Sequence, residues 1–451
     1  MLKLMLKKHT KHNHRSIKPI RQKSPSRLVF QNSYLLGSAC FLATLFSAQA
    51  ETLIEHPVTE RRLFGDALGG DWHDTPNLTG DWGGLLSSLE DRGLVPYAAY
   101  VGEFMDNASG GSDEGSAFGG LLDFGLEADL EKLVGWEGGS FLINAFYFKG
   151  NDVSGDHVGD FNAVSNLYTD TEFNVFNIYL RQSFDGDRLW FKGGQIAVDD
   201  DFMVSESSLL FINASFGPLP VQSGNIAAPI YSLAAPGALV YIEPVKDWYL
   251  QGAVYAGDAG PAQSDNQGFD WRTGGATGWA WFGEVGHNYD LLEGGVIKLG
   301  GYYASSEFTN FTDGNTERGL GAFYAVLDQR VLSSETSSFG MSFFLRGGVT
   351  PDDEVATVEA YLDGGVVFDN VLMDNDALGF AFSQTWFGDD YQNDARAGGD
   401  DVSSSEIVLE ATYQFKVTEW FAVQPDLQYI IDPHFSMDNA LVVGARAVII
   451  F

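Results

Sequence analysis

From about residue 94 onward, polar and apolar side chains alternate in short runs of roughly ten residues. Residues 121–131, 407–417 and 421–431 show the pattern with few interruptions. In each run, aliphatic and aromatic side chains occupy every second position, and carboxylates and amides fill most positions between them. Because successive side chains of a strand point to opposite faces, these runs predict β-strands with one apolar and one strongly polar face.

The same interpretation along the chain predicts an all-β fold of about 16 strands. An even number is expected for a single-chain bacterial barrel, in which outward residues face lipid and inward residues face water. A soluble sandwich also alternates, but its polar face is usually Thr, Ser and Lys. We therefore predict a transmembrane antiparallel β-barrel over residues 94–451. The predicted strands are 94–104, 121–131, 139–149, 172–184, 188–197, 238–244, 247–256, 278–286, 296–305, 318–328, 338–348, 355–367, 377–387, 406–417, 420–431 and 440–451.

The connections between these strands favour the same fold. If both termini are periplasmic, every odd-numbered connection is extracellular and should be long. Most odd connections, such as 150–171, are long, whereas even ones such as 185–187 are short turns. The odd connection 349–354 and the even connection 287–295 are exceptions to this rule.

The longest connection, 198–237, contains four prolines and many aliphatic and aromatic residues. A loop of this length usually has a function, and this one is too apolar for an open surface loop. We predict that it folds into the barrel as a constriction loop. An additional hairpin in the segment, which would give 18 strands, is the alternative.

Residues 51–93 are predicted to form a periplasmic segment before the barrel. Leu85, Leu86 and Leu89, followed by Arg-Gly at 92–93, predict a short helix that ends at a glycine. The simplest role of this helix is to pack under the barrel mouth.

Residues 1–50 carry nine Lys and Arg and no Asp or Glu. An apolar stretch at 34–46 precedes Ala-Gln-Ala at 48–50, which has the small residues of a cleavage site. We predict a secretory signal peptide that is removed after residue 50; a start at Met5 would shorten it only slightly. Cys40 lies inside the apolar stretch, which continues past it, so a lipoprotein site fits poorly.

Composition limits the remaining possibilities. Without the signal peptide, 17 Lys and Arg stand against 61 Asp and Glu, a net charge of −44. This charge argues against nucleic acid as a partner. The mean hydropathy of −0.07 excludes a bundle of transmembrane helices, each of which needs about 20 apolar residues. Since no cysteine remains in the mature chain, its stability must come from a closed hydrogen-bonded sheet.

The chain ends on Phe451, and apolar residues occupy every second position before it, from Leu441 to Ile449. A terminal aromatic residue on an apolar strand face resembles the signal read by the outer-membrane insertion machinery. We therefore expect that machinery to be a partner of the chain.

Several sequence blocks resemble the OprB-type carbohydrate-selective porins. Leu-Thr-Gly-Asp-Trp-Gly-Gly at 78–84 and Gln-Pro-Asp-Leu-Gln-Tyr at 424–429 are the most specific. Gly-Gln-Ile at 194–196, Asp-Asp-Asp-Phe at 199–202 and Phe-Ile-Asn-Ala-Ser-Phe-Gly at 211–217 lie between them. The blocks extend over nearly all of the mature chain. The resemblance implies a 16-stranded barrel that admits glucose and related sugars past charged and aromatic residues, whose positions these blocks do not fix.

Pore-facing residues follow from the alternation itself. If Phe176, Ile178 and Leu180 face lipid, then Asn177, Tyr179 and Arg181 face the lumen. Basic side chains on inner faces would set a transverse field and donate to sugar hydroxyls, and aromatic faces would stack on sugar rings. The alternative is that charges in a wide lumen are merely solvated. The basic and aromatic residues predicted to line the pore are Arg181, Lys192, Arg346, Arg446, Trp190 and Tyr179. The acidic residues predicted to face them are Asp123, Glu127, Asp129, Glu410 and Asp426.

Taken together, these patterns predict passive diffusion of small neutral sugars through the outer membrane of a Gram-negative bacterium. Membrane lipid, lipopolysaccharide and the sugars are the expected partners, and no cofactor, metal or enzymatic activity is expected. None of the five histidines of the mature chain has metal-ligand spacing. A general or cation-preferring porin is the second hypothesis. The third is a β-rich enzyme or glycan-binding protein, either secreted or in the outer membrane.

Overall fold

The computed structural model describes residues 76–261, 267–333 and 339–451. The predicted signal peptide and residues 51–75 lie outside them. Within the described residues, no helix has both the length and the apolar content needed to cross a membrane.

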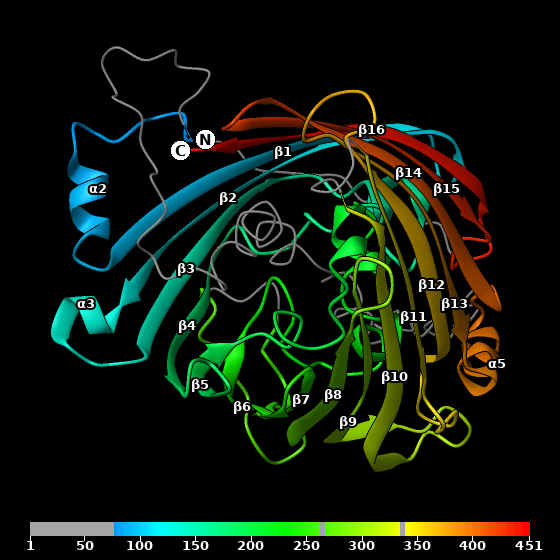
Figure 1. The fold of residues 1–451 in the computed structure, drawn as a ribbon. Coiled ribbons are helices and arrows are strands. Elements are labelled where there is room, and N and C mark those ends of the chain that lie inside the picture. The colour runs from blue at the N-terminus through cyan, green and yellow to red at the C-terminus, as the bar shows by residue number, and fades with distance from the viewer. Residues whose placement is uncertain (1–75, 262–266, 334–338) are drawn as a thin grey trace, which may run out of the picture.

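Sixteen strands in chain order form one closed antiparallel barrel, in which β1 pairs with both β2 and β16 (Figure 1). The predicted strand number and fold class are confirmed. Closure satisfies the backbone groups of every strand, which is a requirement for a sheet in lipid. The strands are β1 Leu94–Gly111, β2 Gly115–Asp129, β3 Gly139–Gly150, β4 Phe173–Phe184, β5 Leu189–Ile196, β6 Ala235–Val245, β7 Trp248–Ala256, β8 Trp279–Tyr289, β9 Gly295–Thr309, β10 Thr316–Leu332, β11 Gly340–Val349, β12 Val358–Asp369, β13 Ala377–Phe387, β14 Ser405–Thr418, β15 Phe421–Ile431 and β16 Asp438–Ile450.

Two strands extend much further than the alternation indicates. The sequence predicts a long connection at 105–120, but β1 runs to Gly111 and β2 begins at Gly115. Polar and glycine residues interrupt the apolar pattern there, and main-chain pairing continues through them. The strand at 355–367 is also displaced, because β12 begins only at Val358.

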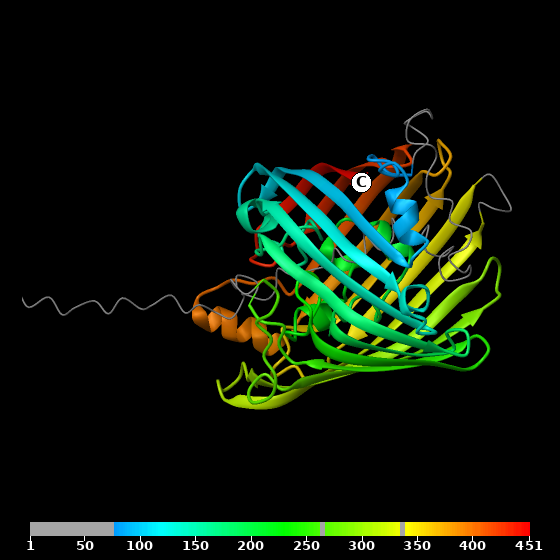
Figure 2. The ribbon, with the colours of Figure 1, turned by 90° about the vertical axis from the view of Figure 1, so that its left-hand side faces the viewer.

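The helices are few and short. Helix α2 (Leu85–Glu90) forms where the leucine pattern predicts one, and it lies outside the ring of strands beside β1 (Figure 1). Its Leu86 is buried, whereas Trp82 and Leu85 are about half exposed. Helix α3 (Leu130–Val134) joins β2 to β3, and α5 (Asp389–Gly398) joins β13 to β14 (Figure 2).

Two long connections fold into the barrel. We call residues 151–172, between β3 and β4, loop L2, and residues 197–234, between β5 and β6, loop L3. L2 contains the π-helix Ser154–Val158. L3 contains two 3-10 helices, Ser207–Leu210 and Ala214–Phe216, and helix α4 (Pro220–Ser223), and it has no strand. The additional hairpin considered for this segment is therefore absent.

Apolar residues of L3 pack against inward-facing residues of the wall. Phe211 and Phe216 lie 5.8 and 6.3 Å, ring centre to ring centre, from Phe344 of β11. Phe202 lies 5.5 Å from Phe282 of β8 in the same way. Burying a phenylalanine contributes roughly 1.5–3 kcal/mol, so these contacts hold L3 against the wall. The apolar composition of the loop is explained by this internal core.

Phe176 faces the interior, which corrects its predicted place on the lipid side. Between two paired positions, β3 advances from Ile143 to Ala145 while β4 advances from Val175 to Ile178. This bulge adds one residue to β4, so Phe176 and Asn177 both point inward. Phe176 is fully buried, 4.9 Å from the ring centre of Phe146. Beyond the bulge the predicted alternation holds, with Leu180 exposed on the outside.

Candidate functional site

Loop L3 follows the inner wall from β7 to β15. Gln251 of β7 donates to the carbonyl of Asp201 at 2.6 Å, and Lys298 of β9 donates to the carbonyl of Val204 at 2.9 Å. Further along, Gln424 of β15 donates to the carbonyl of Leu210 at 2.7 Å. Side chains of many strands thus fix the course of the loop, as expected for a segment that narrows a lumen.

Two of the acidic residues predicted to line the pore lie beneath L3. Glu410 accepts the backbone N–H groups of Ile212 at 2.6 Å and Asn213 at 2.9 Å. Asp426 accepts from Gln428 at 2.9 Å, and both carboxylates are almost fully buried. They face inward as predicted, but they bind the loop and its supporting network rather than open water.

Loop L2 is held by a carboxylate that was not among the predicted site residues. Glu406 of β14 accepts the backbone N–H groups of Phe161 at 2.7 Å, Asn162 at 2.9 Å and His434 at 3.0 Å. The alternation places Glu406 on the same inward face as Glu410, so the sequence could have identified it as an inward-facing carboxylate. The His434 side chain, in the β15–β16 connection, lies 2.8 Å from the Tyr391 hydroxyl, and burial lowers its pKa to about 4.

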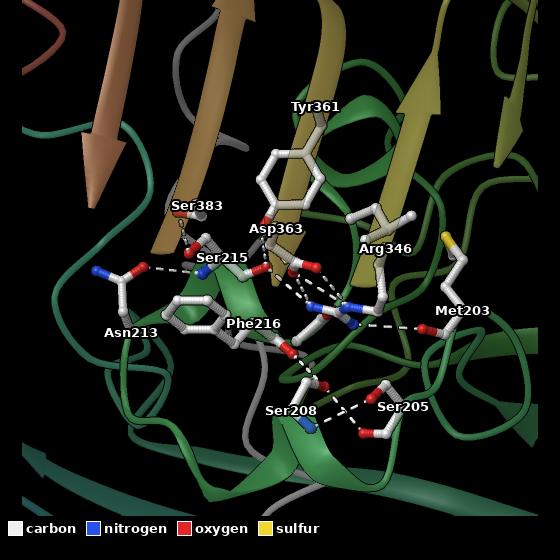
Figure 3. A network of polar contacts seen from close by, with 12 residues as sticks. Met203, Ser205, Ser208, Asn213, Ser215, Phe216, Arg346, Tyr361, Asp363 and Ser383 are labelled. Atoms are coloured by element: carbon white, nitrogen blue, oxygen red, sulfur yellow. Dashed lines mark hydrogen bonds and ion pairs between the residues drawn. The ribbon is translucent and has the colours of Figure 1, made fainter. Parts of the chain in front are cut away.

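Two of the three arginines predicted to line the pore, Arg346 and Arg446, are each only 1% exposed. Arg346 of β11 is paired with Asp363 and covered by L3 (Figure 3). Arg446 of β16 is paired with Glu103 and contacts Asn166 of L2. Both face inward, but the infolded loops bury them, so their predicted contact with the pore is wrong.

The predicted acidic residues of β2 divide into three environments. Asp129 is at the end of the strand and accepts the N–H groups of Glu131 and Lys132, so it caps α3 rather than lining the pore. This correction follows from the strand ending at Asp129, two residues earlier than expected. Asp123 is buried and accepts from Asn144 at 3.3 Å. Glu127, on the same face as Asp123, is exposed.

The remaining basic and aromatic residues predicted to line the pore lie on the inner faces of β4 and β5, where Lys192 is buried and Arg181, Tyr179 and Trp190 are partly exposed. Lys192 forms an ion pair with Asp201 of L3, and its ammonium lies 5.1 Å from the centre of the Tyr179 ring. Arg181 keeps a third of its side chain exposed and pairs with Asp187 at 3.2 Å. Lys192 thus lies against the Tyr179 ring beside L3, and Arg181 lies over the Trp190 ring toward the short-turn end of β4.

Three stacked rings continue from Arg181 across neighbouring strands. Trp190 of β5 stacks on Tyr241 of β6, with ring centres 5.1 Å apart and planes 9° apart. Tyr241 in turn lies 5.3 Å from Tyr249 of β7, whose hydroxyl donates to Glu284 at 2.7 Å. We call Trp190, Tyr241 and Tyr249 the aromatic ladder. Trp190 and Tyr241 are partly exposed, whereas Tyr249 is buried, so a solute can reach the ladder at Trp190 and Tyr241.

Comparison with known proteins agrees with this geometry. Residues 113–451 match the family described as carbohydrate-selective porin, OprB family. Porin B of Pseudomonas aeruginosa is 26% identical over 423 residues, which cover 83% of this chain and 91% of that protein. The high-pH structure of Pseudomonas putida OprB has a TM-score of 0.76 at 23% identity and covers 84% of this chain and 99% of that chain. OmpF of Salmonella typhi, solved with daunomycin, has a TM-score of 0.50 at 10% identity, over 80% of this chain and 99% of that chain. The two structural similarities concern the barrel fold alone.

Proposed function

The chain belongs to the OprB family of carbohydrate-selective porins, which are outer-membrane channels, and we propose that small neutral sugars pass through it along the aromatic ladder. Transport is passive and makes no use of a cofactor or of catalysis. The observation that carries this proposal is the half-open stack of Trp190 and Tyr241, with Arg181 at its end.

Physical chemistry favours a sugar at this stack. The C–H face of a pyranose packs on an aromatic ring, and hydroxyls at its edge accept hydrogen bonds from a guanidinium group or donate them to a carboxylate. Arg181 supplies such donors, and the exposed Glu127 supplies an acceptor on the inner face of β2. A channel requires weak binding, because a tight site would retain its solute.

Loop L3 acts in this proposal as the constriction loop. Its contact with Lys192, next to Tyr179, narrows the route where the loop reaches the inner face of β5. By the usual orientation of bacterial barrels, the long connections are extracellular and the short turns are periplasmic. A sugar would then meet L2 and L3 first and the aromatic ladder afterwards.

A cation-preferring pore is a second candidate, favoured by the large excess of carboxylates in the chain. Several inward carboxylates, including Glu406 and Glu410, accept hydrogen bonds from backbone N–H groups of the loops. Ion preference would therefore rest on the accessible groups, such as Glu127 and Arg181. Cation preference and sugar passage are compatible in one channel.

Swelling of liposomes that contain the purified barrel tests the proposal. Glucose should enter faster than a neutral solute of equal size that lacks a pyranose ring. A general porin would admit the two solutes at the same rate, and that result would remove the sugar-selective function.

A further inference from the structure

Two arginines on different parts of the inner wall share one arrangement. Arg346 of β11 lies opposite Asp363 of β12 in the strand register, and Arg446 of β16 lies opposite Glu103 of β1. Each arginine forms an ion pair with the carboxylate opposite it, at 2.5 and 2.6 Å respectively. A cross-strand pair of opposite charges neutralises each guanidinium within the wall and leaves its other N–H groups for a further partner.

The remaining donors of Arg346 go to backbone carbonyls of L3 (Figure 3). Its Nη1 donates to Gly217 at 2.8 Å and to Met203 at 3.3 Å, and its Nη2 donates to Ser215 at 3.3 Å. Met203 and Gly217 belong to separate arms of the loop, on either side of the Phe211–Phe216 segment. A single side chain therefore fastens both arms to the wall and to each other.

Tyr361 reinforces this junction. Its hydroxyl lies 2.7 Å from the carbonyl of Ser215 and 2.8 Å from Asp363, so it connects the same carboxylate to the same loop residue. Arg346, Tyr361 and Asp363 are all buried. Water therefore cannot replace these hydrogen bonds without a movement of the loop.

Arg446 holds L2 against the wall in the same way. Its Nη2 donates to Asn166 Oδ1 at 2.6 Å, and its Nε donates to Glu103 at 2.8 Å. The backbone N–H of Asn166 donates to the carbonyl of Ile212 in L3 at 2.9 Å. The arginine on β16 thus supports L3 through L2, and the two loops form one connected body.

We propose that Arg346 and Arg446 are positioning residues that set the cross-section of the pore, and hence the largest sugar that passes, by fixing L3 and L2 against the wall. The inference rests on the proposed function, since it assigns a size limit to that channel. Neither arginine touches the sugar. Each acts through the loop that it holds.

Arginine suits this role for a geometric reason. Its planar fork binds a carboxylate with two N–H groups and still presents others in fixed directions, whereas lysine has one compact ammonium. Loss of Arg346 leaves Asp363 as an unpaired buried charge and removes the donor from three loop carbonyls, which is strongly unfavourable. The least costly response is for L3 to move until water reaches these groups, and this movement widens the passage.

The test measures sugar size selectivity in reconstituted channels. Arg346→Met and Arg446→Met should raise the entry rate of a trisaccharide, relative to glucose, by roughly two- to fivefold, with an increase in single-channel conductance. Arg346→Lys should restore the selectivity only in part. Arg318→Met is the matched control, because Arg318 forms an exposed ion pair with Glu307 away from both loops. An unchanged size profile in both folded methionine variants would overturn the proposal.

Two further variants separate loop positioning from folding. Tyr361→Phe removes only the hydroxyl that joins Ser215 to Asp363, and it should shift the size profile in the same direction by a smaller factor. Arg346→Met combined with Asp363→Leu avoids the unpaired charge and should keep the barrel folded with a widened size limit. If the double variant keeps the wild-type limit, loop positioning is refuted. A different result would refute the proposed function itself: a wild-type channel that does not distinguish sugars from other solutes.

Discussion

The guanidinium carbon of Arg181 lies 4.8 Å from the centre of the Trp190 indole ring. Trp190 is the first ring of the aromatic ladder, which continues through Tyr241 to Tyr249. Both side chains remain partly exposed, unlike Arg346 and Arg446, which the loops bury. A positive charge held over an aromatic face in the accessible part of the lumen can meet both ions and sugars. The predictions about permeation follow from this pair.

Replacing Arg181 with alanine should make ion flow more cation-selective and weaken the block of current by sugar. The change removes a partly exposed positive charge from the inner face of β4. The lost hydrogen bond to a sugar hydroxyl contributes about 1 kcal/mol, or roughly fivefold in affinity. Reversal potentials and sugar titrations in planar bilayers measure the two effects. Arg181→Lys should keep the ion selectivity. A change in selectivity with unchanged sugar block would mean that Arg181 sets the field alone.

The orientation of the barrel is open to direct labelling. A cysteine at Asn393, an exposed position of α5, should react with an impermeant reagent on intact cells. A cysteine at Gly186, in the exposed β4–β5 turn, should react only after the outer membrane is opened. The reverse pattern would show that the long connections are periplasmic.

Deleting Phe451 should reduce insertion into the outer membrane far more than it reduces synthesis. The residue adds one backbone hydrogen bond, to the carbonyl of Ala98 at 3.0 Å, and its loss should cost the folded barrel only a few kcal/mol. A large defect therefore reports recognition by the insertion machinery. Refolding in detergent is the control, since the truncated chain should refold nearly as well as the full chain. Normal insertion in cells would contradict the targeting role of Phe451.

Protonation of His434 should loosen the cover formed by L2, α5 and the β15–β16 connection. Burial lowers the pKa of His434 to about 4, and its ring lies against Phe161, Phe387 and Tyr391. The unfolded segment binds the proton more readily, so the stabilisation is complete above a pH of about 6.5 and is lost as the pH falls toward 4. The loss amounts to about 3 kcal/mol at most. Protection factors of the L2 amides, which correct exchange for its intrinsic pH dependence, measure it at pH 7 and pH 4.5. They should fall more between these pH values in the natural chain than in His434→Phe, and an equal change in the two chains would contradict the prediction.

Alternation predicted the barrel because it reports a physical requirement at every strand. Lipid demands apolar side chains outside, so the faces of β14 and β15 are readable from sequence alone. It failed at Phe176, where one additional residue in β4 reverses the faces. The mark of the bulge in the sequence is weak: the inward-facing Asn174 and Asn177 are three positions apart, where an unbroken strand would place them an even number apart.

Alternation alone could not separate pore-lining residues from residues that hold loops. Arg181 and Arg346 look alike in sequence, since each is a basic residue on an inner face. What distinguishes them is whether L2 or L3 covers them, and this depends on contacts between residues more than 100 positions apart. The apolar composition of L3 indicated that the loop turns inward, but it did not indicate which wall residues the loop would bury.

The measurement that tests this account most directly is the block of single-channel current by glucose in the Trp190→Ala channel. The change removes a partly exposed ring of the aromatic ladder. Contact with such a ring contributes about 1 kcal/mol or more to the binding of a sugar, so the half-blocking concentration should rise roughly fivefold to tenfold. Trp281 is exposed on the outer wall, so the Trp281→Ala channel should be blocked at the same glucose concentration as the natural channel. If the folded Trp190→Ala channel is blocked at the natural glucose concentration, sugars do not pass along the ladder and the central claim is wrong.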